Sequence, residues 1–255
     1  MTDRRILRIS GADRIEFLQG LVTNDVHKLD SGMVYAALLT PQGKYIADFF
    51  LSRDGDSVLL DVAEPHADGL AQRLAMYRLR ADVRIDETGL HLHRGLGEPP
   101  EDGFADPRSP ALGWRAYRDA PQDTDDVDWT ALRVEHLVPE TGVELTPDSF
   151  ILEAGFERLS GVDFRKGCYV GQEVTARMKH KTELRKGLAR VLVDGHAEPG
   201  TEITAEGKAA GMLLSRSGNR AIAYLRFDRT THAMLAGTAH VSLDADSPVG
   251  GPARK

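Results

Sequence analysis

The stretch Asp163–Arg177, DFRKGCYVGQEVTAR, holds the only cysteine of the 255-residue chain, Cys168. Lys166 precedes this cysteine, and Gly167 and Gly171 flank it. Nearby cations and free backbone N–H groups stabilise a thiolate, and the residues after Gly171 predict a helix that begins beside the loop. A small buried core residue is the alternative, because lone cysteines are usually buried. The polar, glycine-flanked setting favours a functional thiol at Cys168, supported by Lys166.

The composition excludes several classes of protein. Hydrophobic residues make up 41% and charged residues 28%, and the net charge of −7 argues against general nucleic-acid binding. No apolar run reaches the roughly 18 residues of a membrane span, and the first residues do not form a secretory signal. One cysteine excludes a disulfide framework and a cysteine-rich zinc site. We therefore expect a cytoplasmic protein that binds neither nucleic acid directly nor a membrane, with no metal site of its own.

Hydrophobic periodicity on both sides of the cysteine motif at 163–177 predicts an α+β chain with a β-rich C-terminal part. On the C-terminal side, short strands separated by turn residues from position 186 onward predict a small antiparallel barrel. On the N-terminal side, Ser10 is the expected N-cap of a short first helix. The predicted helices span 10–22, 64–79 and 127–138, and the predicted strands span 33–40, 45–52, 57–62, 82–86 and 113–118. Residues 95–127 are rich in Pro, Gly and Asp and predict loops around one strand.

These patterns divide the chain into three expected domains. The first, an α+β domain, covers 1–95, and the second, which carries the cysteine motif and could interleave with the first, covers 96–183. The third is the barrel at 184–255.

The octapeptide KGCYVGQE at 166–173 resembles the signature of the YgfZ family, the folate-binding relatives of the glycine-cleavage T-protein. Three further stretches resemble that group in the same order along the chain: 9–26, 38–51 and 128–145. The resemblance implies an aminomethyltransferase-like fold, with two α/β domains and a C-terminal antiparallel β-barrel arranged as a ring. It also implies a tetrahydrofolate-binding accessory protein of iron–sulfur cluster assembly or repair. Its partners would be assembly proteins and client enzymes, including radical enzymes that modify tRNA.

The resemblance also assigns folate contacts. Trp129 matches an aromatic contact of the ring system, and Glu135 matches the carboxylate that pairs with the pterin edge. The alternatives are core packing for Trp129 and an ion pair with Arg133 or Arg158 for Glu135. The remaining positions expected to contact tetrahydrofolate, or a one-carbon derivative of it, are Asp48, Tyr169, Gln172, Glu173 and Arg177. Arg177 belongs to a basic cluster at 177–186 that could attract the glutamate tail of folate, and a solvated helix face is the alternative for this cluster.

A folate-dependent one-carbon transferase with an unknown acceptor is the alternative function, and a folate-binding module without chemistry is a third possibility. In the T-protein the corresponding hairpin carries two adjacent aspartates, of which the first is catalytic. Here Ala47 stands in the catalytic position and Asp48 follows it. A methyl group cannot transfer a proton, so the chain is not expected to be a true aminomethyltransferase.

Overall fold

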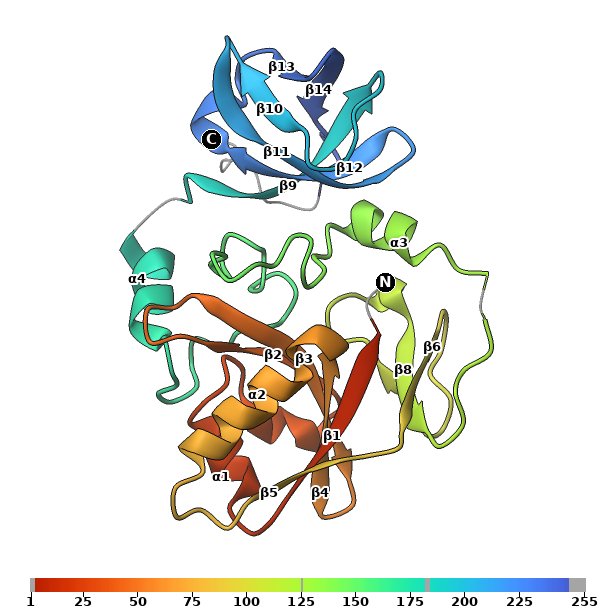
Figure 1. Ribbon diagram of the computed structural model, residues 1–255, viewed down its shortest axis with the longest axis vertical. Coiled ribbons are helices and arrows are strands. Elements are labelled where there is room, and N and C mark those ends of the chain that lie inside the picture. Colours follow the sequence, from red (N-terminus) through yellow and green to blue (C-terminus); the bar gives the residue numbers. More distant parts are fainter. Residues whose placement is uncertain (1–2, 125, 182–183, 248–255) are drawn as a thin grey trace. The chain divides into compact units, whose positions relative to one another are not determined.

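The computed structural model describes residues 3–124, 126–181 and 184–247 (Figure 1). The chain forms two compact units. The N-terminal unit contains Thr2–Asp126 and Phe156–Ala176, and the barrel unit contains Val127–Gly155 and Arg177–Lys255. The three-domain division at 95 and 183 stays a prediction.

A five-stranded antiparallel sheet forms the centre of the N-terminal unit, in the order β2-β3-β4-β1-β5. Tight turns join β2 to β3 and β3 to β4, as the turn residues at 41–43 and 54–56 predict. The strands are β1 (Arg4–Ser10), β2 (Val34–Leu39), β3 (Tyr45–Asp54), β4 (Ser57–Ala63) and β5 (Arg84–Glu87).

Two α-helices accompany this sheet, α1 (Arg14–Gln19) and α2 (Glu64–Tyr77). The helical periodicity predicted a stripe of Leu70, Leu74 and Tyr77. Leu70 and Leu74 are buried, with Ala67, in the core cluster shared with the sheet, whereas Tyr77, the last residue of α2, is 40% exposed.

The start of the chain differs from the sequence prediction. Ser10 ends β1, so it does not cap the first helix, whose N-cap position is Asp13. The strand β1 was not predicted, because three arginines in RRILRIS obscure its alternation. These arginines extend from a central strand to carboxylates on other parts of the unit.

A second, three-stranded sheet follows in the N-terminal unit, in the order β6-β8-β7. Its strands are β6 (His91–Gly95), β7 (Phe104–Ala105) and β8 (Trp114–Arg118). The strand expected near 113–118 is confirmed as β8.

The barrel unit begins with the helix α3 (Trp129–His136) and ends in a closed six-stranded barrel of order β10-β11-β12-β9-β14-β13. The predicted antiparallel barrel is thus confirmed. The helix α4 (Gln172–Lys181) precedes the barrel in the chain. The barrel strands are β9 (Lys186–Asp194), β10 (Glu202–Ala205), β11 (Lys208–Ser217), β12 (Arg220–Arg226), β13 (Met234–Ala236) and β14 (Ala239–Leu243).

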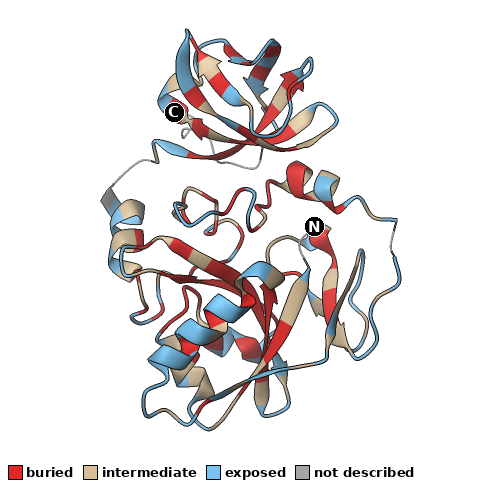
Figure 2. Ribbon diagram, in the orientation of Figure 1, coloured by how far each residue is buried: buried red, intermediate tan, exposed pale blue. Residues whose placement is uncertain are grey.

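Buried residues are found in the strands and helices of both units (Figure 2). The barrel encloses its own apolar cluster, to which Val191, Ile203, Leu213 and Leu225 contribute fully buried side chains. Among the residues that the structure describes, no helix is long and apolar enough to cross a membrane.

Candidate functional site

The cysteine motif forms an irregular loop in the N-terminal unit that leads into α4 at Gln172. The helix predicted to begin near Gly171 is confirmed. Cys168 is exposed in this loop, while Lys166 and Tyr169 are only 8% and 7% exposed. The loop therefore presents its thiol to solvent between two side chains that are turned inward.

Lys166 anchors the loop. Its Nζ donates hydrogen bonds to the backbone carbonyls of Gln19, Val22 and Asn24, with N–O distances of 2.8, 2.5 and 3.0 Å. Three carbonyl oxygens match the three donors of an ammonium group. Lys166 is a predicted catalytic residue, and in this structure its charge lies within the protein and ties the motif loop to the last residue of α1 and the segment that follows it.

Burial lowers the pKa of the Lys166 ammonium from 10.5 to about 8, although the carboxylates of Asp25 and Asp163 act in the opposite direction. Between pH 8 and pH 10.5, Lys166 has released its proton in the folded chain but still holds it in the unfolded chain. The free energy of unfolding therefore rises with pH across this window.

A Lys166→Met variant lacks this titration but keeps most of the aliphatic chain. From about pH 7.5 to about pH 9.5, we expect the wild type to gain about 2 kcal/mol in free energy of unfolding relative to the variant. Urea denaturation of both proteins at both pH values measures the difference. Identical pH dependence of the two proteins would contradict a buried, titrating ammonium.

Asp163 fixes the beginning of the loop. Its carboxylate lies 2.7 Å from Nζ of Lys28 and accepts a hydrogen bond of 2.7 Å from the backbone N–H of Arg165. Although burial opposes ionisation, these contacts hold the pKa of Asp163 below its usual value. The backbone N–H of Asp163 donates to the carbonyl of Thr23 at 3.1 Å. The loop is thus held at both of its inward residues before Cys168.

Glycine at 171 is required by backbone geometry and by a close approach. Its φ is +84°, and a Cβ at this position would lie 2.6 Å from the carbonyl oxygen of Thr40 at the end of β2. From the facing turn, a Cβ on Gly43 would lie 2.9 Å from Cβ of Val174. The β2–β3 turn therefore packs directly against the end of the motif loop and the start of α4.

We expect Gly171→Ala to destabilise the protein by about 1–3 kcal/mol, because it combines an unfavourable φ with a clash against backbone. Gly167→Ala is the matched control, since a Cβ at that position would have no other atom within 4 Å and its φ is not in the left-handed region. Thermal unfolding of both variants checks the prediction. Equal losses at the two positions would contradict the close approach of the turn.

The remaining motif residues divide into buried and exposed. The Tyr169 ring centroid lies 5.2 Å from Nζ of Lys166, and burial raises the pKa of its phenol. Gln172 Nε2 donates to the Gly167 carbonyl at 3.5 Å, a long contact. Glu173 and Arg177 are exposed on α4. These predicted folate positions thus offer a surface of Glu173 and Arg177, with Tyr169 packed beneath the loop.

Asp48 lies on β3 and is only 4% exposed. Its carboxylate accepts hydrogen bonds from the hydroxyls of Tyr35 at 3.0 Å and Tyr45 at 2.6 Å. Ala47, the neighbouring residue, pairs with Leu38 across the hairpin and is buried. Of positions 47 and 48, only the second carries a carboxylate, and the hydroxyls of two tyrosines enclose it.

Trp129 and Glu135 lie at the start and near the end of α3 in the barrel unit. Trp129 is 8% exposed. The half-exposed carboxylate of Glu135 pairs with Arg220 on β12 and lies 3.3 Å from Nη1 of Arg190 on β9.

The alternative expectation for Glu135, an ion pair with Arg133 or Arg158, is wrong, because its partners are Arg190 and Arg220. Residues two apart on a helix point in different directions. Arg133 instead lies 2.9 Å from a carboxylate oxygen of Glu140 and 3.2 Å from one of Glu144.

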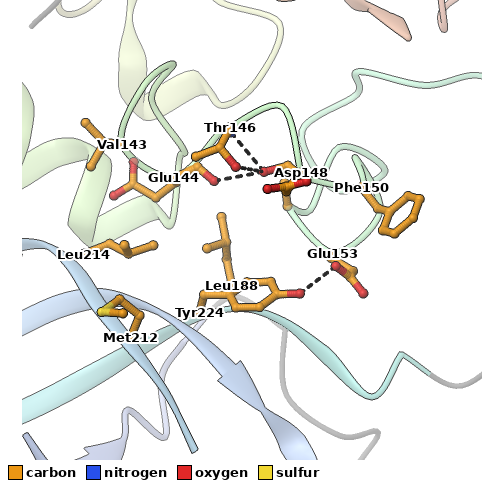
Figure 3. A pocket seen from close by; sticks show the side chains of 12 residues that line it. Val143, Glu144, Thr146, Asp148, Phe150, Glu153, Leu188, Met212, Leu214 and Tyr224 are labelled. Atoms are coloured by element: carbon orange, nitrogen blue, oxygen red, sulfur yellow. Dashed lines mark hydrogen bonds between the residues drawn. The ribbon is translucent and has the colours of Figure 1, made fainter. Parts of the chain in front are cut away.

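The barrel unit also contains a pocket of about 240 Å³ that the sequence patterns do not indicate (Figure 3). Leu188, Met212, Leu214 and Tyr224 line it from the barrel strands, and eight of the residues between 143 and 154 complete the lining. The Tyr224 hydroxyl donates to Glu153 at 2.7 Å. The lining comes from separate segments without a shared motif, so no sequence signal identifies it, and it contains none of the predicted site residues.

The chemistry available at the motif loop is that of one thiol. Among the described residues, no group of three or more His, Cys, Asp or Glu side chains could hold a metal ion. A four-iron cluster needs about four protein ligands. Cys168 can therefore act as a nucleophile or as one ligand in a shared site, but it cannot hold such a cluster alone.

Comparison with known proteins identifies both the barrel and the whole fold. Residues 185–248 match the family described as "CAF17, C-terminal beta-barrel domain". The structure is similar to the glycine cleavage system aminomethyltransferase T from Bartonella henselae, with a TM-score of 0.76, 15% sequence identity, and coverage of 95% of this chain and 83% of that one. The predicted aminomethyltransferase-like fold is confirmed.

Three relatives are named mitochondrial iron–sulfur cluster assembly factor IBA57 or its homologue. The relative from Mycosarcoma maydis is 34% identical over 72% of this chain and 54% of its own length. The relative from Mus musculus is 29% identical over 96% of this chain and 82% of its own length. The chain thus spans only about half of the first relative.

The mitochondrial names contradict the predicted cytoplasmic location. That prediction rested on a single cysteine and on the lack of a secretory signal. Neither feature distinguishes one reducing compartment from another.

The third relative settles the family. The protein from Pyricularia oryzae is 30% identical over 96% of this chain and 75% of its own length. The match therefore includes both units, with the motif loop as well as the barrel. On this evidence the chain belongs to the family of IBA57 iron–sulfur cluster assembly factors.

Proposed function

We propose that this protein acts in iron–sulfur cluster assembly and that Cys168 is its functional thiol. The names of the relatives support the first part. The observation that carries the second part is the exposed Cys168 in a loop whose neighbouring side chains are fixed inward. The partners are iron–sulfur assembly proteins and the enzymes that receive the clusters.

Because the chain has one thiol, it contributes a single ligand to a cluster. Cys168 contributes one ligand in a transient complex, and the partner contributes the other ligands of the cluster. Anchoring by Lys166 and Asp163 holds the loop in one conformation before the partner arrives. A preorganised ligand loses little conformational entropy on binding.

The resemblance of the octapeptide to the YgfZ family extends this proposal to client enzymes. We propose that the clients include radical enzymes that modify tRNA, because that family's role implies them. Contact is with the client proteins, since the net charge of −7 disfavours direct binding of nucleic acid.

Tetrahydrofolate, or a one-carbon derivative of it, is the proposed ligand. An ionised carboxylate has roughly four acceptor positions, and the Arg190 and Arg220 contacts engage one oxygen each of Glu135. The half-exposed carboxylate can therefore also accept two bonds from an aminopyrimidine edge. Trp129 is too buried to offer a stacking face, so this part of the proposal rests on Glu135.

We expect Glu135→Gln to weaken tetrahydrofolate binding about tenfold or more, because an amide presents a donor where the pterin edge needs an acceptor. Glu153→Gln is the matched control in the same unit, at a carboxylate bonded to Tyr224. Titration calorimetry measures the three affinities. Equal affinity in all three would remove Glu135 from the site, and no binding by the wild type would contradict folate as a ligand.

A one-carbon transferase with an unknown acceptor is less well supported. The buried methyl of Ala47 cannot act as a base, and Asp48 is enclosed by two tyrosines. We therefore place the function in cluster assembly.

Complementation tests the proposed function. Cells deleted for their own relative are given the wild-type chain, and a four-iron enzyme and an iron-free enzyme are assayed in the same extract. We expect the four-iron activity to recover and the iron-free activity to stay constant. A stably expressed chain that restores no four-iron activity would overturn the proposal.

A further inference from the structure

The C-terminal end of α2 exposes three large apolar side chains within four residues. Met76 is 71% exposed, Tyr77 40% and Leu79 89%. Single exposed apolar residues are ordinary, but a group of them marks a contact surface. The buried stripe of α2, which includes Leu70 and Leu74, packs into the core of the unit. Met76 lies off this stripe, Tyr77 continues its spacing at the exposed last residue of the helix, and Leu79 follows the helix.

Leu79 has an unfavourable backbone conformation that its own contacts do not offset. Its φ is +45°, directly after the helix's C-cap residue, where glycine is favoured. A leucine in this conformation is strained, and a side chain that is 89% exposed gains almost no burial in return. The loop is nevertheless fixed, because Arg78 Nη1 donates to the Val83 carbonyl at 3.3 Å and the Ala81 N–H donates to the Arg78 carbonyl at 2.8 Å.

Two arginines accompany the exposed apolar group. Arg73 lies three and four residues before Met76 and Tyr77, so it shares their helix face, and Arg80 follows Leu79. Both are exposed, and neither has an ion pair with any residue that the structure describes. The carboxylate of nearby Asp82 accepts a hydrogen bond of 3.2 Å from the backbone N–H of Ala12.

Several other arginines of the same unit are neutralised, although Arg84 is also exposed without an ion pair to any described residue. Arg8 lies 2.8 Å from a carboxylate oxygen of Asp54, and Arg5 pairs with Glu64. In a chain of net charge −7, two unpaired guanidinium groups beside an apolar projection form a local positive surface.

We propose that Arg73, Met76, Tyr77, Leu79 and Arg80, here called the α2-end patch, form a docking surface for a protein partner. The partner presents an apolar pocket for Leu79, with carboxylates around its rim. Arginine binds carboxylates with two parallel hydrogen bonds, and Arg, Tyr and Met are residue types enriched in protein interfaces. The α2-end patch is independent of the thiol at Cys168 and adds a recognition surface to the proposed function.

A protein fits the α2-end patch better than a membrane does. Helices that lie on lipid bury a long apolar face in the bilayer surface, whereas the long apolar stripe of α2 is already in the core of the unit. The exposed apolar group is short and projects from a fixed turn, which suits insertion into a pocket.

Site-specific photo-crosslinking in cells tests the proposal. A benzophenone amino acid replaces Leu79 in the full chain and, as the matched control, Leu96, another exposed leucine of the same unit. We expect an adduct from position 79 alone, with the partner's crosslinked peptide lying beside Asp or Glu residues. An adduct to a second copy of this chain, an adduct to phospholipid, or no adduct at position 79 would each overturn the proposal.

Binding of the purified crosslinked partner then separates docking from folding. Leu79→Gly removes the side chain and relieves the left-handed strain, so we expect affinity to fall at least tenfold while the unfolding temperature stays equal or rises. Arg80→Glu is expected to weaken binding similarly, and Leu96→Gly to leave it unchanged. Wild-type affinity in both Leu79→Gly and Arg80→Glu would contradict the proposal.

Discussion

Replacing Asp61 with alanine is expected to destabilise the protein by about 3–5 kcal/mol, because it leaves buried cationic groups without their carboxylate. The Asp61 side chain is fully buried on β4. It accepts hydrogen bonds of 2.6 Å from Arg4 Nε, 2.6 Å from Arg115 Nη2 and 3.0 Å from the Tyr117 hydroxyl. Arg115 is itself buried, with its guanidinium carbon 3.9 Å from the ring centroid of Phe50.

Lowering the pH tests the contribution of the Asp61 carboxylate in the wild type, because protonation removes its charge. Burial opposes ionisation of Asp61, but Arg4 and Arg115 prevail and lower its pKa from 3.8 to about 2. The stability that this carboxylate contributes is therefore fully present above about pH 4 and is lost as the pH falls toward 2. Urea denaturation of the wild type and Asp61→Ala from pH 7 to pH 3 measures both effects.

Asp68→Ala is the control, since Asp68 is 88% exposed and pairs with Arg5 at the surface. It is expected to change stability little. A loss of less than about 1 kcal/mol in Asp61→Ala would contradict the view that this cluster holds β1, β4 and β8 together.

The second large effect is functional. Cys168→Ala and Cys168→Ser are expected to fold normally, because the side chain is exposed, and to leave a four-iron enzyme in the complemented strain at the level of the empty vector. The serine variant keeps the size and polarity of the side chain and loses only the chemistry of sulfur. Asp68→Ala serves as a control for expression and is expected to restore full activity.

The fold was largely predictable from local patterns in the sequence. Apolar residues at helical spacing identified α2, and turn residues between apolar runs identified the β2–β3–β4 meander and the barrel. The charged cluster around Asp61 was not predictable, because its partners Arg4 and Arg115 are more than fifty positions away along the chain. The sequence does not show which distant side chains a sheet brings together.

The sequence indicated candidate site residues but not their orientations. Glycine spacing and an isolated polar cysteine pointed to Cys168, and the exposed thiol agrees with that interpretation. The direction of Lys166 depends on three carbonyls more than 140 positions earlier, which no local pattern specifies. Glu135 shows the same limit, since its arginines come from barrel strands that close only in the folded unit.

Chemical modification of the native chain tests the role of Cys168 most directly, because the chain has no other thiol. Purified protein is alkylated to increasing extents with iodoacetamide, and each sample is added to an extract of the deletion strain to support loading of a four-iron apo-enzyme. We predict that loading falls in proportion to the labelled fraction, measured by mass spectrometry, and reaches the level without added chain when Cys168 is fully labelled. Undiminished loading by the fully alkylated protein would contradict the account.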